Sequence, residues 1–306
     1  MLCPAARHAM SRLRAMKPAA RIVSTLTLLL ALAACGGREA TTSTDGTTPA
    51  AADKKPLTIK GSDTMVILGQ RLAEEYMVKN PGMVVQVNGG GSGTGIAALI
   101  NGTTDICMSS RPMKEAEKKK LRDRFQSMGT EIPVAKDGLS IYVHTTNPVK
   151  EITLDQLRRI YLGEIVSWKE LGGPQAPITV YGRENSSGTY VYFKDNVLKG
   201  RDFAPRVQTL PGTAAVVNAV SKDKNGIGYG GAAYTKGVRD LGLIPVAGKP
   251  AIYPNTATVA DGSYPLTRYL YFYLRAKPAG DIKKFVDYVL SPEGQKITTL
   301  VGYFSL

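Results

Sequence analysis

From residue 57 onward, short apolar runs alternate with stretches in which apolar residues recur every three or four positions. The short runs predict β-strands, and the recurring pattern predicts amphipathic helices. Strands are predicted at 57–60, 83–87, 105–108, 139–143, 178–181, 227–229, 243–246 and 269–274. Helices are predicted at 65–76, 96–100, 114–124, 154–161, 189–198, 214–221, 281–290 and 292–300. Because strands and helices alternate, the chain is predicted to have an α/β fold.

The first part of the chain has a different pattern. An apolar run of 13 residues, 22–34, is too short to span a bilayer and follows a basic segment containing Arg7, Arg12, Arg14, Lys17 and Arg21. The run ends in Leu32-Ala33-Ala34-Cys35, which resembles a bacterial lipobox. We therefore predict a lipoprotein signal peptide at 1–34 and lipidation of Cys35, the alternative being a signal peptide with a chance cysteine. Residues 35–56 are predicted to be this cysteine and a flexible tether, because residues 36–56 lack aromatic and large aliphatic side chains.

Composition excludes several classes of protein. With 43% hydrophobic and 21% charged residues, the chain is neither wholly disordered nor a multi-span membrane protein. Its net charge of +14 suggests an anionic partner, either nucleic acid, a membrane surface or a small acidic ligand. No clustered basic and aromatic stripe supports nucleic-acid binding. After signal removal, Cys107 and His144 are too few for a thiolate cluster, a histidine metal site or a hydrolase triad, so neither a metal nor a cofactor is predicted.

Three loops share one chemistry that fits a small anion. Residues 61–64 (GSDT), 89–95 (GGGSGTG) and 183–189 (RENSSGT) each follow a predicted strand and open a predicted helix. The first N–H groups of a helix lack partners and carry partial positive charge, glycine allows close approach, and hydroxyls add donors. Each loop alone could be an ordinary helix cap. Together, and with Arg183 able to present a two-pronged guanidinium, they favour an oxyanion site.

Nucleotide-binding and hydrolase motifs fail at specific positions. A P-loop would need Lys and then Ser or Thr after Gly95, where Ile96 and Ala97 stand. A dinucleotide fingerprint starting at Gly91 would need glycine at 96, and a nucleophile elbow centred on Ser92 would need glycine at Thr94. Trp168 is predicted to be a core or interlobe anchor, and the basic run 118–120 a solvated helix face.

From about residue 57 to its end, the chain resembles the phosphate-binding lipoprotein family of bacterial phosphate ABC importers. The resemblance rests on GSDT (61–64), GGGSGTGI (89–96), DICMSSRPM (105–113), IYLGEIVSWKELGG (160–173), RENSSGTY (183–190), NGIGYGG (225–231) and YPLTRYLYFYL (264–274). It implies a periplasmic-binding-protein fold of the second type, in which two α/β lobes enclose phosphate in a cleft. Lobe 1 is expected at 57–139 and 240–306, and lobe 2 at 140–239.

The resemblance also implies the ligand set and the partners. It carries phosphate contacts onto Thr64, Met65 (through its N–H), Ser92, Ser110, Arg183, Ser187, Gly188 and Thr189. Arg111 is expected either to bind the anion directly or to pair with Asp105. Where some family members have an aspartate that accepts the phosphate proton, this chain has Ser110, so Asp63 is the first candidate acceptor and Asp105 the second.

The expected protein is a receptor without enzymatic activity, lipid-anchored outside the cytoplasmic membrane. It is expected to be monomeric and to deliver phosphate to the membrane-embedded permease of the importer. Sulfate, molybdate or tungstate as the ligand is the first alternative, and a phosphatase or serine hydrolase is the second. Because phosphate carries a proton near neutral pH and sulfate does not, a carboxylate acceptor would discriminate between them by repelling sulfate.

Overall fold

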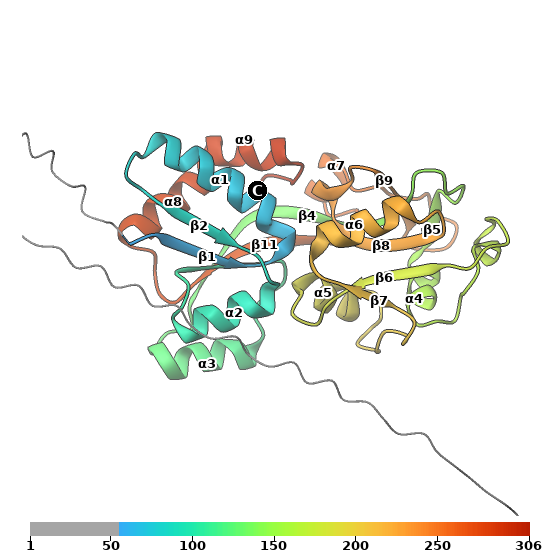
Figure 1. Ribbon diagram of the computed structural model, residues 1–306, viewed down its shortest axis with the longest axis horizontal. Helices are drawn as coiled ribbons and strands as arrows, with labels where there is room; N and C mark the ends of the chain where they lie inside the picture. The colour runs from blue at the N-terminus through green and yellow to red at the C-terminus, as the bar shows by residue number, and fades with distance from the viewer. Residues whose placement is uncertain (1–54) are drawn as a thin grey trace, which may run out of the picture. The chain divides into compact units, whose positions relative to one another are not determined.

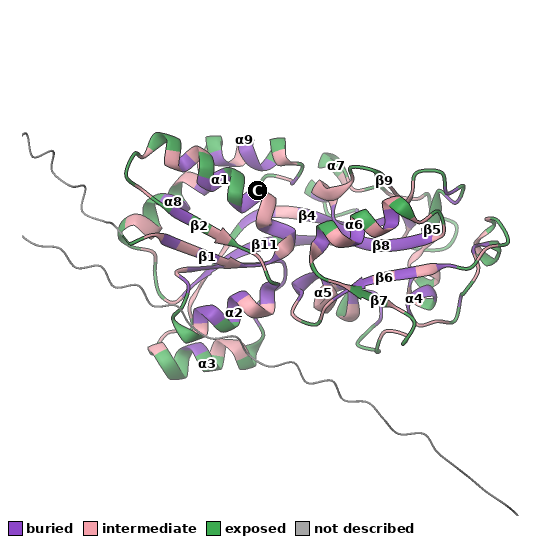
Figure 2. Ribbon diagram, in the orientation of Figure 1, coloured by how far each residue is buried: buried purple, intermediate pink, exposed green. Residues whose placement is uncertain are grey.

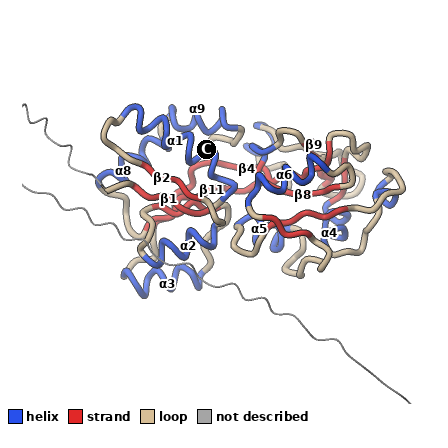
Figure 3. The backbone as a smooth tube through the Cα atoms, viewed as in Figure 1, coloured by secondary structure: helices blue, strands red, loops and turns tan. Residues whose placement is uncertain are grey.

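The computed structural model describes residues 55–306, so the predicted signal peptide, Cys35 and the tether up to residue 54 lie outside the described residues. One sheet runs through the described chain in the order β2-β1-β3-β11-β4-β8-β6-β7, with β9 paired to β4 (Figures 1 and 3). A second, two-stranded sheet pairs β5 with β10. The strands are β1 (Leu57–Gly61), β2 (Val85–Asn88), β3 (Ile106–Ser109), β4 (Thr130–His144), β5 (Glu151–Thr153), β6 (Thr179–Arg183), β7 (Gln208–Leu210), β8 (Gly226–Gly231), β9 (Val238–Asp240), β10 (Gly242–Ile244) and β11 (Thr267–Leu274).

Helices cover both faces of the sheet in lobe 1, because successive residues of a strand point to opposite sides. On β3, Ile106 and Met108 pack in one core cluster, whereas Cys107 between them packs in another. The first cluster includes side chains of α1 (Val66–Lys79), α8 (Gly280–Leu290) and α9 (Pro292–Val301). The second includes side chains of α2 (Ser92–Asn101) and α3 (Glu115–Phe125). Buried strands between partly exposed helices are visible in Figure 2.

Lobe 2 is built in the same way around the second half of β4. Ile141 and Val143 belong to a large cluster that includes side chains of α4 (Leu154–Tyr161) and α5 (Gly188–Asn196), whereas Tyr142 packs with α6 (Gly212–Lys222). Trp168, in the 3-10 turn Trp168–Leu171, is fully buried in the large cluster, and its Nε1 donates to the Asn225 carbonyl at 3.0 Å. The prediction of Trp168 as a core residue is therefore confirmed. A short helix, α7 (Thr256–Ala260), completes the lobe. The 3-10 turn Ala232–Tyr234 lies at the junction, since Ala233 packs against the lobe 1 core and the Tyr234 hydroxyl donates to the Asp63 carbonyl.

Two antiparallel strands, β4 and β11, join the lobes. Val134 and Ala135 of β4 pack in the lobe 1 core, and Leu139 packs in the lobe 2 core, so the first crossing lies next to the predicted boundary at 139. The return crossing differs from the prediction at 240. Leu241, Leu243, Val259, Tyr264 and Leu266 still pack in the lobe 2 core, so we move that boundary to Thr267, where β11 begins. The strand pattern near 243 does not reveal its partner, which is β5 of lobe 2.

The remaining differences from the predicted elements have local causes. Helix α2 begins at Ser92, four residues before the predicted start at 96, because the glycine-rich stretch continues into the helix. Strand β4 begins at Thr130 and includes Pro133, which lies where the pairing with β11 shifts register between Leu270 and Tyr271. Elements β5, β7, β9 and α7 are too short to show a period. No helix within residues 55–306 is both long and apolar enough to cross a membrane.

Candidate functional site

The loops that follow the parallel strands meet where the two lobes face each other. Strands β1, β2 and β3 run parallel in lobe 1, and β6, β7 and β8 run parallel in lobe 2. All three predicted loops leave the carboxyl ends of such strands and lead into η1 (Asp63–Met65), α2 and α5. Helix N-termini at the carboxyl edge of a sheet are the usual place for an anion, because their N–H groups are unpaired and partly positive.

Four hydroxyl side chains form a buried cluster across the two lobes. Thr64 Oγ1 of lobe 1 lies 2.8 Å from Thr189 Oγ1 of lobe 2, and Ser110 Oγ lies 3.5 Å from the same atom. Ser92 Oγ is 3.3 Å from Ser110 Oγ and accepts a hydrogen bond from the Ser110 N–H at 3.1 Å. All four residues are at most 1% exposed. Residues predicted from separate motifs are thus brought together, and their O–H groups can serve as donors to one small ligand.

Glycine permits the close approach of the lobes at this cluster. A Cβ added at Gly188 would lie 2.2 Å from Ser92 Oγ and 2.7 Å from Ser110 Oγ, so any side chain there would overlap the opposite lobe. The Gly93 N–H donates to the Ser186 carbonyl at 2.8 Å, which adds a backbone bond between the lobes. The structure is therefore a closed arrangement in which the two lobes touch through the predicted loops.

Arg183 is surrounded by acceptors, one of which is Asp63, the chain neighbour of Thr64. Its side chain is 1% exposed, and its Nη2 donates to Asp63 Oδ2 of the other lobe at 2.8 Å. It also donates to Glu184 (Nε–Oε2 3.2 Å, Nη2–Oε1 2.8 Å) and to Thr213 Oγ1 (2.8 Å). Burial alone would raise the pKa of Glu184, but its hydrogen bonds from Arg183 hold that pKa below its usual value. Two carboxylates therefore orient and compensate the guanidinium.

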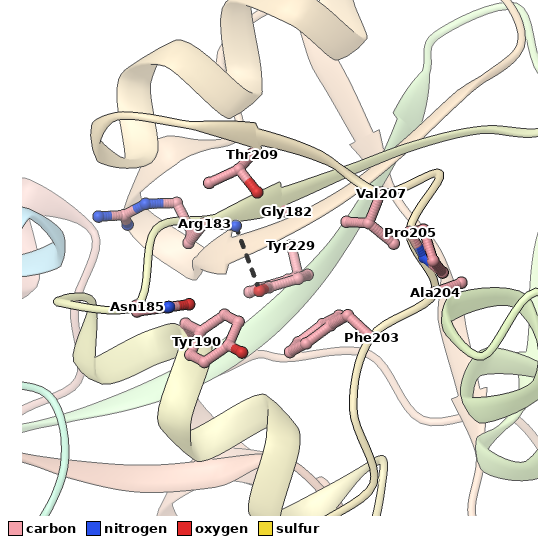
Figure 4. A pocket seen from close by; sticks show the side chains of 10 residues that line it. All are labelled: Gly182, Arg183, Asn185, Tyr190, Phe203, Ala204, Pro205, Val207, Thr209 and Tyr229. Carbon is pink, nitrogen blue, oxygen red and sulfur yellow. Dashed lines mark hydrogen bonds between the residues drawn. The ribbon is translucent and has the colours of Figure 1, made fainter.

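A cavity of about 220 Å³ lies on the lobe 2 side of this arginine (Figure 4). It is lined by the aromatic rings of Tyr190, Phe203 and Tyr229, with Asn185 at its edge. Tyr190 and Phe203 are stacked with their centroids 4.7 Å apart, and the Tyr229 hydroxyl accepts from the Arg183 N–H at 3.4 Å. The guanidinium points away from the cavity (Figure 4). The aromatic cluster thus supports the backbone of the loop, and the charged group faces the other lobe.

Two predicted ligands have other contacts in this closed arrangement. The Met65 N–H donates to the Ser62 carbonyl at 2.9 Å inside the 3-10 turn, so it is not free for a ligand here, and the Met65 side chain lies in the lobe 1 core. Ser187 Oγ accepts from the Tyr190 N–H at 3.2 Å and so caps α5, although its own O–H remains able to donate. Asp63, besides its pairing with Arg183, accepts from the Gly90 N–H at 2.8 Å through Oδ1.

Of the two alternatives expected for Arg111, direct contact with the anion or pairing with Asp105, the pairing with Asp105 is wrong. Arg111 forms a two-pronged pair with Glu117 on α3, with Nη1–Oε2 2.8 Å and Nη2–Oε1 2.7 Å. Asp105 instead accepts from the Thr58 N–H and hydroxyl at 2.9 and 2.8 Å, and lies 3.6 Å from Arg275. Because Asp105 precedes β3 and Ser110 follows it, the whole strand separates Asp105 from the hydroxyl cluster, which removes it as the second candidate proton acceptor.

Glu184 and Thr213, which the sequence did not single out, both accept hydrogen bonds from Arg183. Glu184 lies inside the 183–189 motif, next to the arginine that it orients. Thr213 follows β7 at the start of α6, so it has the same strand, glycine and helix arrangement as the three predicted loops. The local pattern Pro211-Gly212-Thr213 could therefore have predicted a fourth loop of the same kind.

Comparisons with known proteins identify the family to which the chain belongs. Residues 39–293 match the PBP superfamily domain. The phosphate-binding protein PstS of Pseudomonas aeruginosa is 35% identical over 263 residues, covering 80% of this chain and 81% of that protein. The PstS of Bacillus subtilis is 32% identical over 278 residues, covering 90% and 89%.

Solved structures of phosphate-binding proteins are also similar to this chain. A protein from Clostridium perfringens, assigned as the substrate-binding protein of a phosphate ABC transporter and solved with bound phosphate, has a TM-score of 0.75 and 30% identity. The match covers 82% of this chain and 100% of that one. An ABC-type phosphate transport receptor from Vibrio cholerae has a TM-score of 0.66 and 29% identity, with coverage of 82% and 100%.

Proposed function

Since the chain belongs to the PBP superfamily and, within it, to the family of PstS phosphate-binding proteins, we propose that it binds inorganic phosphate and delivers it to an ABC importer. The observation that supports this most directly is the buried cluster of Thr64, Ser92, Ser110 and Thr189, which joins hydroxyls of both lobes beside Arg183. A tetrahedral anion between the lobes would receive donors from each of them. Closure excludes water and strengthens every charge-assisted bond.

The proposed ligand set consists of Thr64, Ser92, Ser110, Arg183, Ser187 and Thr189. Gly188 contributes close approach between the lobes, and Glu184 and Thr213 orient the guanidinium. Arg111 is assigned to Glu117 and holds the loop after β3 against α3, so it is proposed as a support for Ser110. The proposed activity is binding and release without chemical turnover.

Asp63 is the proposed acceptor of the phosphate proton, because it precedes Thr64 of the cluster and its carboxylate lies between Arg183 and the Gly90 N–H. We expect Asp63→Asn to reduce the preference for phosphate over sulfate at least tenfold, since the neutral amide no longer repels the unprotonated anion. The ratio of the two dissociation constants, measured by calorimetry at pH 6 and pH 8, is the readout.

The ratio matters because Asp63 also holds Arg183, and losing that contact would weaken both anions together. Glu184→Gln is the matched control, since it neutralises the other carboxylate partner of the same arginine. An unchanged ratio in Asp63→Asn, or an equal change in Glu184→Gln, would contradict the assignment. Failure of the wild-type protein to bind phosphate would overturn the proposed function itself.

We propose further that the protein acts outside the cytoplasmic membrane, attached through a lipid on Cys35. This rests on the lipobox in the sequence and on the transport role of the similar proteins from Clostridium perfringens and Vibrio cholerae. Mass spectrometry of the N-terminal peptide from the membrane fraction should show an acylated Cys35, and Cys35→Ser should move the protein out of that fraction. An unmodified Cys35 in membrane-bound protein would refute the lipid anchor and leave the phosphate site unaffected.

A further inference from the structure

A fully buried ion pair lies where the two connecting strands cross between the lobes. Asp137 of β4 and Arg268 of β11 face each other in register, and their side chains are 0% and 3% exposed. Asp137 Oδ2 accepts from Arg268 Nε at 3.0 Å and from Nη2 at 2.8 Å. Neither residue belongs to the proposed ligand set.

The pair contacts both lobes. Arg268 Nη1 donates to the Ser110 carbonyl of lobe 1 at 3.2 Å, beneath the hydroxyl cluster. At the lobe junction, Asp137 Oδ1 accepts from the Ala232 N–H at 3.0 Å. In lobe 2, the Arg268 guanidinium lies 5.2 Å from the ring centroid of Tyr192 on α5. The Tyr192 hydroxyl in turn donates to the Thr267 carbonyl at 2.9 Å, next to Arg268.

Stability alone is a poor explanation for such a pair. Burying two charges costs so much desolvation that apolar replacements of similar volume are often neutral or stabilising, whereas removing one partner is strongly destabilising. The hydrogen bonds of the pair instead hold two backbone groups in place at the lobe junction, the Ala232 N–H and the Ser110 carbonyl. A change in the angle between the lobes would alter the contact between Arg268 and Tyr192 while β4 and β11 stay paired.

We propose that Asp137 and Arg268 form a hinge clasp, which positions Ser110 for the anion and stabilises the closed arrangement of the lobes. Both are positioning residues that act through Ser110, Ala232 and Tyr192. In its effect on binding, the proposal rests on the proposed phosphate function. Its effect on the closed arrangement is independent of the identity of the ligand.

The test replaces both charges at once, so that neither is left buried and unpaired. In the double variant Asp137→Leu/Arg268→Met we expect folding stability close to wild type, a phosphate dissociation constant raised at least tenfold, and faster dissociation. Arg268→Lys keeps the charge but loses the guanidinium fork and should give a smaller loss; it serves as the test if the double variant does not fold. Wild-type affinity in a folded variant would overturn the proposal.

A second readout does not depend on phosphate. Spin labels at Val78→Cys in lobe 1 and Val246→Cys in lobe 2, both well exposed, report the distance between the lobes. Without ligand, the double variant should show a larger share of long distances than wild type. Arg239→Lys is the matched control, because Arg239 binds the Asn147 and Val149 carbonyls within lobe 2. It should lower stability and leave the distance distribution unchanged, whereas identical distributions in the double variant and wild type would refute the clasp.

Discussion

Arg183→Ala is expected to lower phosphate affinity about a thousandfold or more, equivalent to roughly 4 kcal/mol. The variant loses a charged donor whose side chain is only 1% exposed. It also leaves Asp63 and Glu184 without the cation that they share. Two uncompensated carboxylates beside the cluster would repel the anion. The loss should therefore exceed that of one hydrogen bond, which is about 1 kcal/mol for an ordinary pair.

Calorimetry or competition binding measures this effect, and two comparisons isolate its cause. Arg201→Ala removes the same charge from the same lobe at a side chain that is 61% exposed, so its affinity should stay close to wild type. Adding Asp63→Asn to Arg183→Ala should restore part of the affinity, because one repelling carboxylate is removed. Phosphate binding by Arg183→Ala within about threefold of wild type would exclude this arginine from the site.

The second large effect is expected from Gly188→Ala. The new Cβ would lie 2.2 Å from Ser92 Oγ, and because Ser92 belongs to the opposite lobe, the overlap exists only in the closed arrangement. We expect phosphate affinity to fall at least a hundredfold while the unfolding transition of the ligand-free protein changes little. Small-angle scattering should also show that the variant, unlike wild type, does not contract when phosphate is added.

Gly228→Ala provides the matched steric control. A Cβ at Gly228 would lie 2.6 Å from Val216 Cγ1 and 2.9 Å from Val220 Cγ2, both in the core of lobe 2. This overlap is present in open and closed arrangements alike, so it should reduce stability and leave phosphate-induced contraction intact. If Gly188→Ala instead destabilised the ligand-free protein as much as Gly228→Ala does and still bound phosphate normally, the proposed contact between the lobes would be wrong.

Much of the fold follows from local patterns. Helix α4 has the predicted bounds, since its apolar spacing and its Thr153 cap are both written in consecutive residues. The three loops at 61–64, 89–95 and 183–189 could also be recognised in the sequence, because strand ends, glycines and hydroxyl caps are short-range signals. Short strands such as β5 and β9 were missed, since three residues cannot display a period.

Contacts within the site could not be predicted from local sequence patterns. The 105–113 motif could not decide the partner of Arg111, because the choice of Glu117 over Asp105 depends on how α3 packs beside the loop. Glu184 lies inside the 183–189 motif, but its hydrogen bond with Arg183 could be found only once the direction of the arginine side chain was known. Asp63 was a candidate from its motif alone, and its contact with Arg183 required the two lobes to be placed against each other.

The sequence by itself determined the α/β alternation, the chemistry of the three loops and the anionic class of the ligand, since each depends on neighbouring residues. The tertiary structure decided the return crossing at Thr267, the meeting of the hydroxyls, the Asp63–Arg183 pair and the Asp137–Arg268 pair. The Thr64–Thr189, Asp63–Arg183 and Asp137–Arg268 contacts each join residues that lie 120 or more positions apart in the chain. Their contact depends on strand register and on packing between the lobes. Both are decided by the free energy of the whole folded chain, so no short segment of the sequence predicts them.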